Sequence, residues 1–505
     1  MYMNSRFLFF LLVFAFLNNL VLSQTTYYSK AGESNPNLLS NWTLNSDGTG
    51  GNPGAFSGDN LIFVIQNGHN YTTTAAWGIT GASTLQVDGT ITFSHVVTLG
   101  NGSNIGNLTV NGTVQANVQN VIANTSGVFT INSGGKYVLN HSTASNGTTT
   151  FNGTETFNSG STFEYQNLSA GGFVSSVTYH HLILNASITQ SFPATITING
   201  DLTVTQGTIT VSKDQTVNNL TVNGGNLILN NGSTSRTFTI NGNAVISGGS
   251  LKITGPLSTA NNICTISGNL TISGGTLTTT DVETTSTLNL YGNITMSSGA
   301  FNKTSGAGTS YIKLLKASGT QIISLSSSLS YAHVWTVGDG ATTTNTLQLL
   351  SNIGIGGVSS FNVKSGATLD CQTYLITGTS ATFNAESGSN VKTAHAEGLS
   401  TTATTGSIQV TGSKTYNSAA SYTYNGSSAQ VIGNGLTGAN NLTIDNTSGV
   451  TLSASLSVSG ALNLTNGRLT LDTYNLTLGA SSTIGGTPSS RMLQGKKTLK
   501  NYINN

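Results

Sequence analysis

Apolar residues alternate with polar residues in short stretches through most of the chain, and one pattern of apolar residues and glycine recurs with fixed spacing. Two apolar residues flank a central residue, a glycine follows five positions after the first, and another apolar residue comes two positions later. This order is seen in Leu202-Thr203-Val204 with Gly207 and Ile209, and it returns from Leu220, Ala244, Leu270, Ile294 and, far downstream, Leu462. A period of two predicts strands whose apolar residues share one face. The glycine predicts a restricted turn, after which a second short strand begins.

The spacing of these copies predicts how the strands are assembled. The first five copies start at 202, 220, 244, 270 and 294, which are 18, 24, 26 and 24 residues apart. One such unit cannot bury its apolar face alone, but stacked copies form a continuous core. We therefore predict an all-β chain folded as a parallel β-helix, or β-solenoid. In this register Leu220 and Leu270 point inward, and the residues between the apolar pairs form an outward column: Thr203, Thr221, Val245, Thr271 and Thr295.

A longer block is repeated at an offset of 260 residues. Residues 181–185 parallel residues 441–445, and Gly207 parallels Gly467. Residues 310–380 carry a degenerate middle copy of this block. Such a duplication is expected in a repeat protein that grew by copying groups of coils.

The two ends of the chain differ from the repeats. Residues 1–23 hold one positive charge and then an apolar run too short to span a membrane, which predicts a secretory signal peptide cut after Ser23. Residues 24–75 are richer in turns and predict an N-terminal cap, with a separate ligand-binding module as the alternative. We place the β-helix repeats at residues 76–487 and a short Lys-bearing tail at residues 488–505. We expect a truncated or frameshifted form of a longer surface protein, with a poorly ordered tail and an exposed last coil prone to self-association.

Composition excludes several classes of function. The chain has 17 Lys and Arg and 16 Asp and Glu among 505 residues, so its formal net charge is only +1. That charge gives no basic surface for nucleic acid, and the low charge with average hydropathy is not typical of disorder. The 61 glycines lack a three-residue period, and proline occurs only 5 times, which excludes collagen. The two cysteines, Cys264 and Cys371, are too few for a disulfide scaffold and are expected to be small buried side chains.

A search for catalytic or metal-binding groups yields weak candidates. Asp281 and Glu283 are the nearest acidic pair, and two positioned carboxylates are what glycoside hydrolysis requires. No His or Arg lies near them in sequence, so we interpret them as solvated surface residues. His180 and His181 are adjacent, and in a strand their side chains would point to opposite faces, so one metal ion could not readily bind both. No residue is assigned as catalytic, cofactor-binding or metal-ligating, and no cofactor is expected.

Two low-complexity features, Gly-Gly pairs and Thr-x-Thr triplets, recur along the chain. The Gly-Gly pairs at Gly224, Gly248 and Gly274 follow strands but precede no helix and no Lys-Ser/Thr, so we interpret them as coil turns rather than phosphate loops. Thr-x-Thr triplets, such as Thr203/Thr205 and Thr208/Thr210, could form outward arrays of the kind that bind ice. Threonine also favours strands for its own steric reasons.

Parts of the chain resemble a known group of proteins. Residues 26–32, Asn41-Trp42 and residues 47–50 are similar to the opening of secreted, repeat-rich β-helix surface proteins of Bacteroidetes, and residues 441–444 and 462–467 resemble their recurring units. The resemblance implies a right-handed β-helix, display at the cell surface, export in many members by the type IX route, and no established reaction. Members usually carry a C-terminal sorting domain, which this sequence lacks.

Together these observations predict a secreted, noncatalytic β-solenoid that acts as a cell-surface adhesive or matrix protein. Its expected partners are extracellular glycans or other cell-surface components, with no nucleic acid and no membrane span. Two alternatives remain open: a polysaccharide-active β-helix enzyme, whose acids would come from neighbouring coils, and an ice-binding solenoid using outward threonines.

Overall fold

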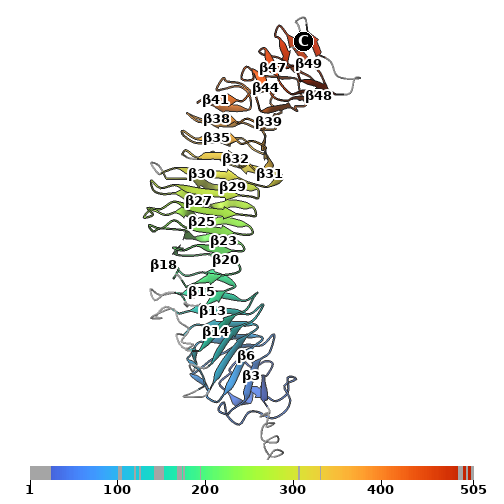
Figure 1. Cartoon of the computed structure of the whole chain (residues 1–505). Coiled ribbons are helices and arrows are strands. Elements are labelled where there is room, and N and C mark those ends of the chain that lie inside the picture. The colour runs from blue at the N-terminus through green and yellow to red at the C-terminus, as the bar shows by residue number, and fades with distance from the viewer. Residues whose placement is uncertain are drawn as a thin grey trace, which may run out of the picture. The chain divides into compact units, whose positions relative to one another are not determined.

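The computed structural model describes residues 24–100, 105–118, 121–123, 127–141, 153–167, 173, 177–193, 195–304, 308–329, 331–486, 493–495 and 499–501. Within these residues the chain is almost entirely β-strand, with one short 3-10 helix at Leu39–Asn41. The strands form a parallel β-solenoid of about 17 turns, which confirms the predicted fold class (Figure 1). The expected signal peptide at 1–23 lies outside the described residues. The chain divides into two compact units, residues 1–182 and 183–505.

The first unit contains three sheets formed by successive coils, and their described ladders are parallel except for the pairing of β1 with β2. One sheet contains β1 (Thr25–Ser29), β2 (Trp42–Thr43), β3 (Leu61–Ile65), β6 (Ser83–Val87), β9 (Gly106–Val110), β12 (Val128–Ile131) and β14 (Thr154–Phe157). The next contains β4 (Asn70–Thr72), β7 (Thr90–Phe93), β10 (Thr113–Ala116), β13 (Lys136–Asn140) and β15 (Thr162–Asn167), and the third contains β5 (Trp77–Ile79), β8 (Val97–Leu99) and β11 (Val121–Ala123). The short strands β16 (Thr178–Tyr179) and β17 (His181–Leu184) follow.

The second unit has a long sheet on one side of the coils. It contains β18 (Thr189–Ser191), β20 (Leu202–Val204), β21 (Thr208–Thr210), β23 (Leu220–Ile228), β25 (Ala244–Thr254), β27 (Leu270–Thr280), β29 (Ile294–Asn302), β31 (Ser318–Leu325), β33 (Thr344–Leu349), β36 (Thr368–Asp370), β39 (Asn390–Thr393), β42 (Ser421–Tyr424), β45 (Leu442–Asp445), β48 (Ala461–Asn466) and β51 (Thr483–Gly485). The short strand β19 (Thr197–Ile198) also lies in this unit.

A second sheet of this unit contains β22 (Gln215–Val217), β24 (Thr237–Ile240), β26 (Asn262–Ile266), β28 (Ser286–Leu290), β30 (Ser310–Leu314), β32 (Val334–Val337), β35 (Ser360–Val363), β38 (Thr382–Ala385) and β41 (Lys414–Tyr416). A third contains β34 (Ile353–Gly354), β37 (Ile376–Gly378) and β40 (Ile408–Val410). The later coils add β43 (Gln430–Val431), β46 (Val450–Thr451), β49 (Leu469–Asp472) and β52 (Leu493–Gly495), and also β44 (Gly438–Ala439), β47 (Leu456–Val458), β50 (Leu476–Leu478) and β53 (Leu499–Asn501).

Each copy of the sequence repeat is one coil of the second unit. Leu202 pairs with Leu220, Leu220 with Ala244, Ala244 with Leu270 and Leu270 with Ile294. All five side chains are fully buried, so the predicted inward stacking of Leu220 and Leu270 is confirmed. Full burial of each large aliphatic side chain contributes about 1.5–3 kcal/mol relative to exposure. The column of buried aliphatic residues is therefore the main stabilising feature of these coils.

In the central coils the glycines of the repeat do not form the predicted turn between two strands. Strands β23, β25 and β27 run through the Gly-Gly pairs and β29 runs through Ser298-Gly299, and register shifts beside these positions mark β-bulges. Only in the coils at Gly207 and Gly467 does the glycine separate two strands, and both of these have φ near +75° (73° and 78°). At Gly225 a Cβ would lie 2.6 Å from Gln206 O, so the close stacking of coils requires glycine there.

Asparagine side chains link the turns of successive coils in the second unit. The side-chain oxygen of Asn219 accepts a hydrogen bond from the backbone N–H of Asn243 (2.9 Å), Asn243 accepts from Asn269 (2.8 Å), and Asn269 accepts from Asn293 (2.9 Å). The ladder continues to the N–H of Ile322. Each amide thus satisfies a turn N–H of the next coil that no strand partner would reach.

The first unit has a more aromatic interior. Trp42 contacts Phe63 and Trp77, with ring centroids 5.2 and 5.9 Å apart, and all three side chains are buried. The pairing of β1 with β2 is antiparallel, unlike the other described ladders, which are parallel. Residues 24–75 therefore belong to the same sheets as the coils that follow them.

Strand pairing continues beyond residue 487 in the described residues. Leu493 pairs with Leu469 and Leu499 with Leu476, so β52 and β53 extend two sheets by one strand each. The remainder of the predicted tail, at residues 488–492, 496–498 and 502–505, lies outside the described residues. Most of the segment that was predicted to be poorly ordered therefore lies outside them as well.

Candidate functional site

The structure gives the predicted acidic pair a role within the protein. Lys252 Nζ on β25 lies 2.6 Å from Asp281 Oδ2, and Thr304 donates a hydrogen bond to Asp281 Oδ1. Glu283 is exposed two residues further along the chain. The Lys252 partner comes from the preceding coil, which sequence proximity did not reveal. Asp281 is therefore held in an ion pair, and Glu283 lies at the surface.

The two histidines lie together rather than on opposite faces. His180 occupies a bend between β16 and β17, and its ring contacts the ring of His181 edge-to-face at 4.3 Å. The expected alternation fails because the bend interrupts the strand at this pair. Among the described residues, no group of three or more His, Cys, Asp or Glu could hold a metal ion.

The cysteines and the threonine column lie where the sequence predicted. Cys264 and Cys371 are free and buried, and burial raises the pKa of the Cys264 thiol to about 12. The outward column runs in register from Thr203 to Thr295 through the five expected residues, with Val245 interrupting it. Of the Thr208/Thr210 pair, Thr210 is buried, so these two hydroxyls do not share an outward face.

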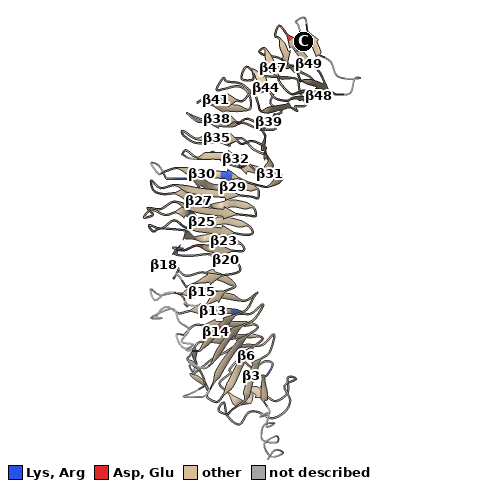
Figure 2. Cartoon of the chain, viewed as in Figure 1, with Lys and Arg blue, Asp and Glu red and all other residues tan. Residues whose placement is uncertain are grey.

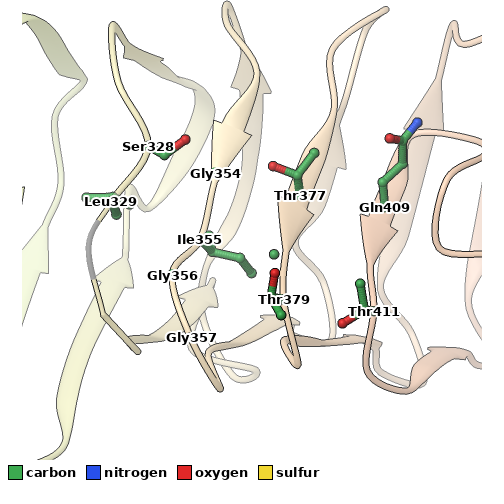
Figure 3. Close-up of a pocket in the computed structure, with 11 residues that line it drawn as sticks. Ser328, Leu329, Gly354, Ile355, Gly356, Gly357, Thr377, Thr379, Gln409 and Thr411 are labelled. Atoms are coloured by element: carbon green, nitrogen blue, oxygen red, sulfur yellow. The ribbon is translucent and has the colours of Figure 1, made fainter. Parts of the chain in front are cut away.

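A hollow of about 420 Å³ opens on the outer side of β34, β37 and β40 in the second unit. Gly354 pairs with Thr377, and Thr377 pairs with Gln409, so three outward positions lie in one row across successive coils. Figure 3 shows Thr377 and Gln409 on neighbouring strands, with Thr379 and Thr411 beside them and Ser328 on the far side of Gly354. The lining contains no charged side chain.

Glycine opens this hollow. A Cβ at Gly354 would overlap Ser328 Oγ and lie 2.6 Å from Ser328 Cβ, so a larger residue would displace the wall of the hollow. A Cβ at Gly356 would lie 2.6 Å from the backbone nitrogen of Tyr331, a residue with a φ of 67°. The row of Gly354, Thr377 and Gln409 therefore lacks a side chain at Gly354, where the next two coils each carry one.

The hydroxyl groups of the hollow are available for a ligand. Those of Ser328, Thr377 and Thr379 have no hydrogen-bond partner among the described residues. The Gln409 side-chain nitrogen donates to Gly406 O (3.1 Å), which fixes the amide and leaves its oxygen as an acceptor. The hollow thus presents donors and acceptors without charge, a combination suited to the hydroxyl groups of a neutral sugar.

Charged residues are sparse in the described part of the chain (Figure 2). Screening by salt acts on charged groups, so contacts in this hollow would change little with ionic strength.

Sequence reasoning missed the residues of this hollow. Ile376-Thr377-Gly378-Thr379 is a Thr-x-Thr triplet that could have drawn attention, and the glycines at 354, 356 and 357 mark the gap. Ser328 and Gln409 have no signal of their own because they join the site only through the stacking of coils.

Among the described residues, no helix has the length and apolar character needed to cross a membrane. Comparison with family models, with curated proteins and with solved structures gave no match to this chain.

Proposed function

We propose that this chain is a secreted, noncatalytic β-solenoid that acts at the cell surface as an adhesive or matrix protein and binds uncharged glycans. The observation that carries the proposal is the hollow over β34, β37 and β40, where hydroxyls that have no hydrogen-bond partner in the described part of the chain face a space of about 420 Å³. A solenoid presents such rows along its length, so weak contacts to one polymer add together. Secretion and surface display rest on the expected signal peptide and on the resemblance to Bacteroidetes surface proteins.

Binding without cleavage is favoured by the chemistry of the hollow. Glycoside hydrolysis requires two carboxyl groups on either side of the scissile bond. The lining of this hollow contains neither Asp nor Glu, and Asp281 is engaged by Lys252 and Thr304. A surface that binds sugar hydroxyls without a positioned acid holds the polymer intact.

The test is retention on insoluble neutral polysaccharides, namely cellulose and xylan, followed by analysis of the supernatant. We expect the full chain to be retained equally at low and high salt, with no release of reducing ends. Thr377→Val keeps the side-chain shape and removes one hydroxyl, so it should weaken retention several-fold, about the loss of one hydrogen bond. Thr271→Val, on the outward column over β27, is the matched control and should bind like the unmodified chain.

Two results would contradict the proposal. One is the appearance of reducing ends or unsaturated sugars from xylan, pectin or alginate, which would establish an enzyme. The other is equal retention of the Thr377→Val and Thr271→Val variants and the unmodified chain, which would exclude the hollow as the binding site.

A further inference from the structure

A second groove lies on the same unit and differs from the neutral hollow in its chemistry. It has a volume of about 550 Å³ and runs over the outward residues of β28, β30, β32 and β35. Asn289, Lys313, Thr336 and Asn362 pair in succession, so they form one row along its floor. Tyr311 lies one row away and pairs with Val334 on the next coil. The groove therefore combines an aromatic ring, a lysine and amide side chains.

The charges around this groove leave one ammonium group without a counter-charge. Lys364 Nζ on the rim lies 2.5 Å from Glu386 Oε1 and is neutralised by it. Lys313 has no ion pair or hydrogen bond with the described residues. Residues 284–364, which form the floor and rim of the groove, hold four lysines and one acidic residue, Asp339, so these coils carry an excess of positive charge.

Asp339 is the acidic residue of the groove lining, and its ionised carboxylate is hydrogen-bonded to its own loop rather than to a lysine. The backbone N–H groups of Ala341, Thr342 and Thr343 donate to it at 2.8–3.0 Å, and the hydroxyls of Thr342 and Thr343 donate at 2.6 and 2.9 Å. These five donors turn the carboxylate toward its own loop and stabilise its ionised form. Asp339 consequently shapes the rim and does not pair with Lys313.

We propose that this groove binds an acidic polysaccharide, with Lys313 pairing with a carboxylate or sulfate group and Tyr311 stacking against a sugar ring. Asn289 donates to Thr265 and Asn362 donates to Trp335 O, so the side-chain oxygen of each remains free to accept from sugar hydroxyls. A charge-assisted hydrogen bond is stronger and shorter than a neutral one, which gives Lys313 the largest share of specificity. The proposal rests on the proposed glycan-binding function but concerns a different site and a different class of sugar.

The experiment compares polygalacturonate with the same polymer after full methyl esterification, which removes the charge and keeps the sugars. Binding of the full chain is followed by affinity electrophoresis, and dextran sulfate serves as a second, sulfated probe. We expect polygalacturonate to bind at least about tenfold more tightly than its ester, the effect of one hydrogen bond to a charged group. Binding should weaken as sodium chloride is added. Dextran sulfate should also bind in a way that depends on Lys313. If it binds more tightly than polygalacturonate, the groove prefers sulfate groups to carboxylate groups.

Variants assign the effect to the groove. Lys313→Gln should lose about tenfold in affinity for polygalacturonate, and Tyr311→Thr, which copies Thr287 of the preceding coil, should lose several-fold. Lys316→Gln is the matched control because it removes the same charge, and Lys316 donates to Thr320 O outside the groove. Urea unfolding of each variant shows whether it is folded. Equal binding of the acid and the ester, or equal losses in Lys313→Gln and Lys316→Gln, would overturn the proposal.

The two sites fail independently. Thr377→Val should leave binding to polygalacturonate unchanged, and Lys313→Gln should leave retention on cellulose and xylan unchanged. Loss of polygalacturonate binding in Thr377→Val would contradict a separate acidic site. Failure of cellulose and xylan retention alone would reject the neutral hollow and leave the acidic groove in place.

Discussion

Two outer surfaces of the second unit cover the same kind of apolar interior but differ in the side chains that they expose. Over β20, β23, β25, β27 and β29, the outward column is Thr203, Thr221, Val245, Thr271 and Thr295, a plain face of small side chains. Over β28–β40 the outward rows are interrupted by Gly354 on one side and by Tyr311 and Lys313 on another. Buried aliphatic or aromatic residues lie behind both. The inner columns therefore set the fold, and irregularities in the outer rows form the hollow and the groove that we propose as binding sites.

The largest expected effect comes from charging an inner column. Leu270 is fully buried between Ala244 and Ile294, whereas its neighbour Thr271 faces outward. Leu270→Asp buries an unpaired carboxylate and should cost several kcal/mol, enough to abolish cooperative unfolding of these coils. Thr271→Asp should change the free energy of unfolding by less than about 0.5 kcal/mol. Urea denaturation followed by circular dichroism measures both, and equal midpoints would contradict the inward register.

Glycine substitution separates close stacking from backbone strain. Gly249 (φ 62°) and Gly319 (φ 77°) both have left-handed backbones, but a Cβ would overlap Gly225 O at Gly249 and meet nothing at Gly319. Gly319→Ala should cost about 1 kcal/mol, the strain of that conformation. Gly249→Ala should cost clearly more because the stacked coils must also separate. Equal free energies of unfolding in the two variants would show that the coils tolerate a side chain at the bulge.

Alkaline pH should lower the stability of the later coils more than that of the coils at residues 202–302. Burial raises the pKa values of Tyr416, Tyr422 and Tyr424 well above that of a free tyrosine, whereas the one tyrosine in residues 202–302, Tyr291, is exposed. In the unfolded chain these tyrosines lose their protons near pH 10. Their contribution to stability is therefore fully present below pH 10 and falls above it, by up to about 1.4 kcal/mol per pH unit for each group.

One lysine in the later coils has the opposite effect on stability, and it acts over a lower pH range. Burial lowers the pKa of Lys414 to about 8, so its contribution to stability rises between pH 8 and about 10.5. Tyr424→Phe removes the hydrogen bond that the Tyr424 hydroxyl donates to Ile432 O, so the urea midpoints of this variant and of the unmodified chain should differ by a constant amount below pH 10, and this difference should change only above pH 10. Identical pH profiles for the two proteins would contradict a buried, protonated Tyr424.

The smallest expected effect is on the stability of outward threonines. Thr271→Val and Thr377→Val should each shift the free energy of unfolding by no more than about 0.5 kcal/mol, because both side chains are partly exposed and neither hydroxyl has a protein partner. Thermal unfolding measures this shift. A large destabilisation by Thr377→Val would mean that its hydroxyl supports the fold and would remove the basis for reading it as a binding group.

Alternation along the chain was sufficient to predict the solenoid and the register of its central coils. The pairing of Leu202 with Leu220, and of each later copy with the next, follows from where the apolar residues recur. The asparagine ladder was also visible in principle, since Gly-Asn precedes the apolar pair at Asn243, Asn269 and Asn293. Its hydrogen bonds depend on turn geometry, which a pattern of apolar positions does not define.

The candidate sites could not be predicted because they are assembled across coils of unequal length. Ser328, Gly354, Thr377 and Gln409 are separated by 26, 23 and 32 residues. A fixed period would have shown them as one row, but the unequal loops between strands conceal it. The bend at His180 and the ion pair of Lys252 with Asp281 escaped prediction for the same reason, since both depend on how the chain turns between strands.

The most direct test of the account is hydrogen–deuterium exchange of the full chain with and without cellohexaose and xylohexaose. The account predicts slower exchange in peptides that cover residues 353–357, 376–379 and 408–411, and unchanged exchange in peptides that cover the plain face around Thr271. Thr377→Val should lose most of this protection. Protection centred on residues 202–302, or no protection at oligosaccharide concentrations that saturate retention on the polymers, would contradict the claim that interruptions of the outer rows form the binding sites.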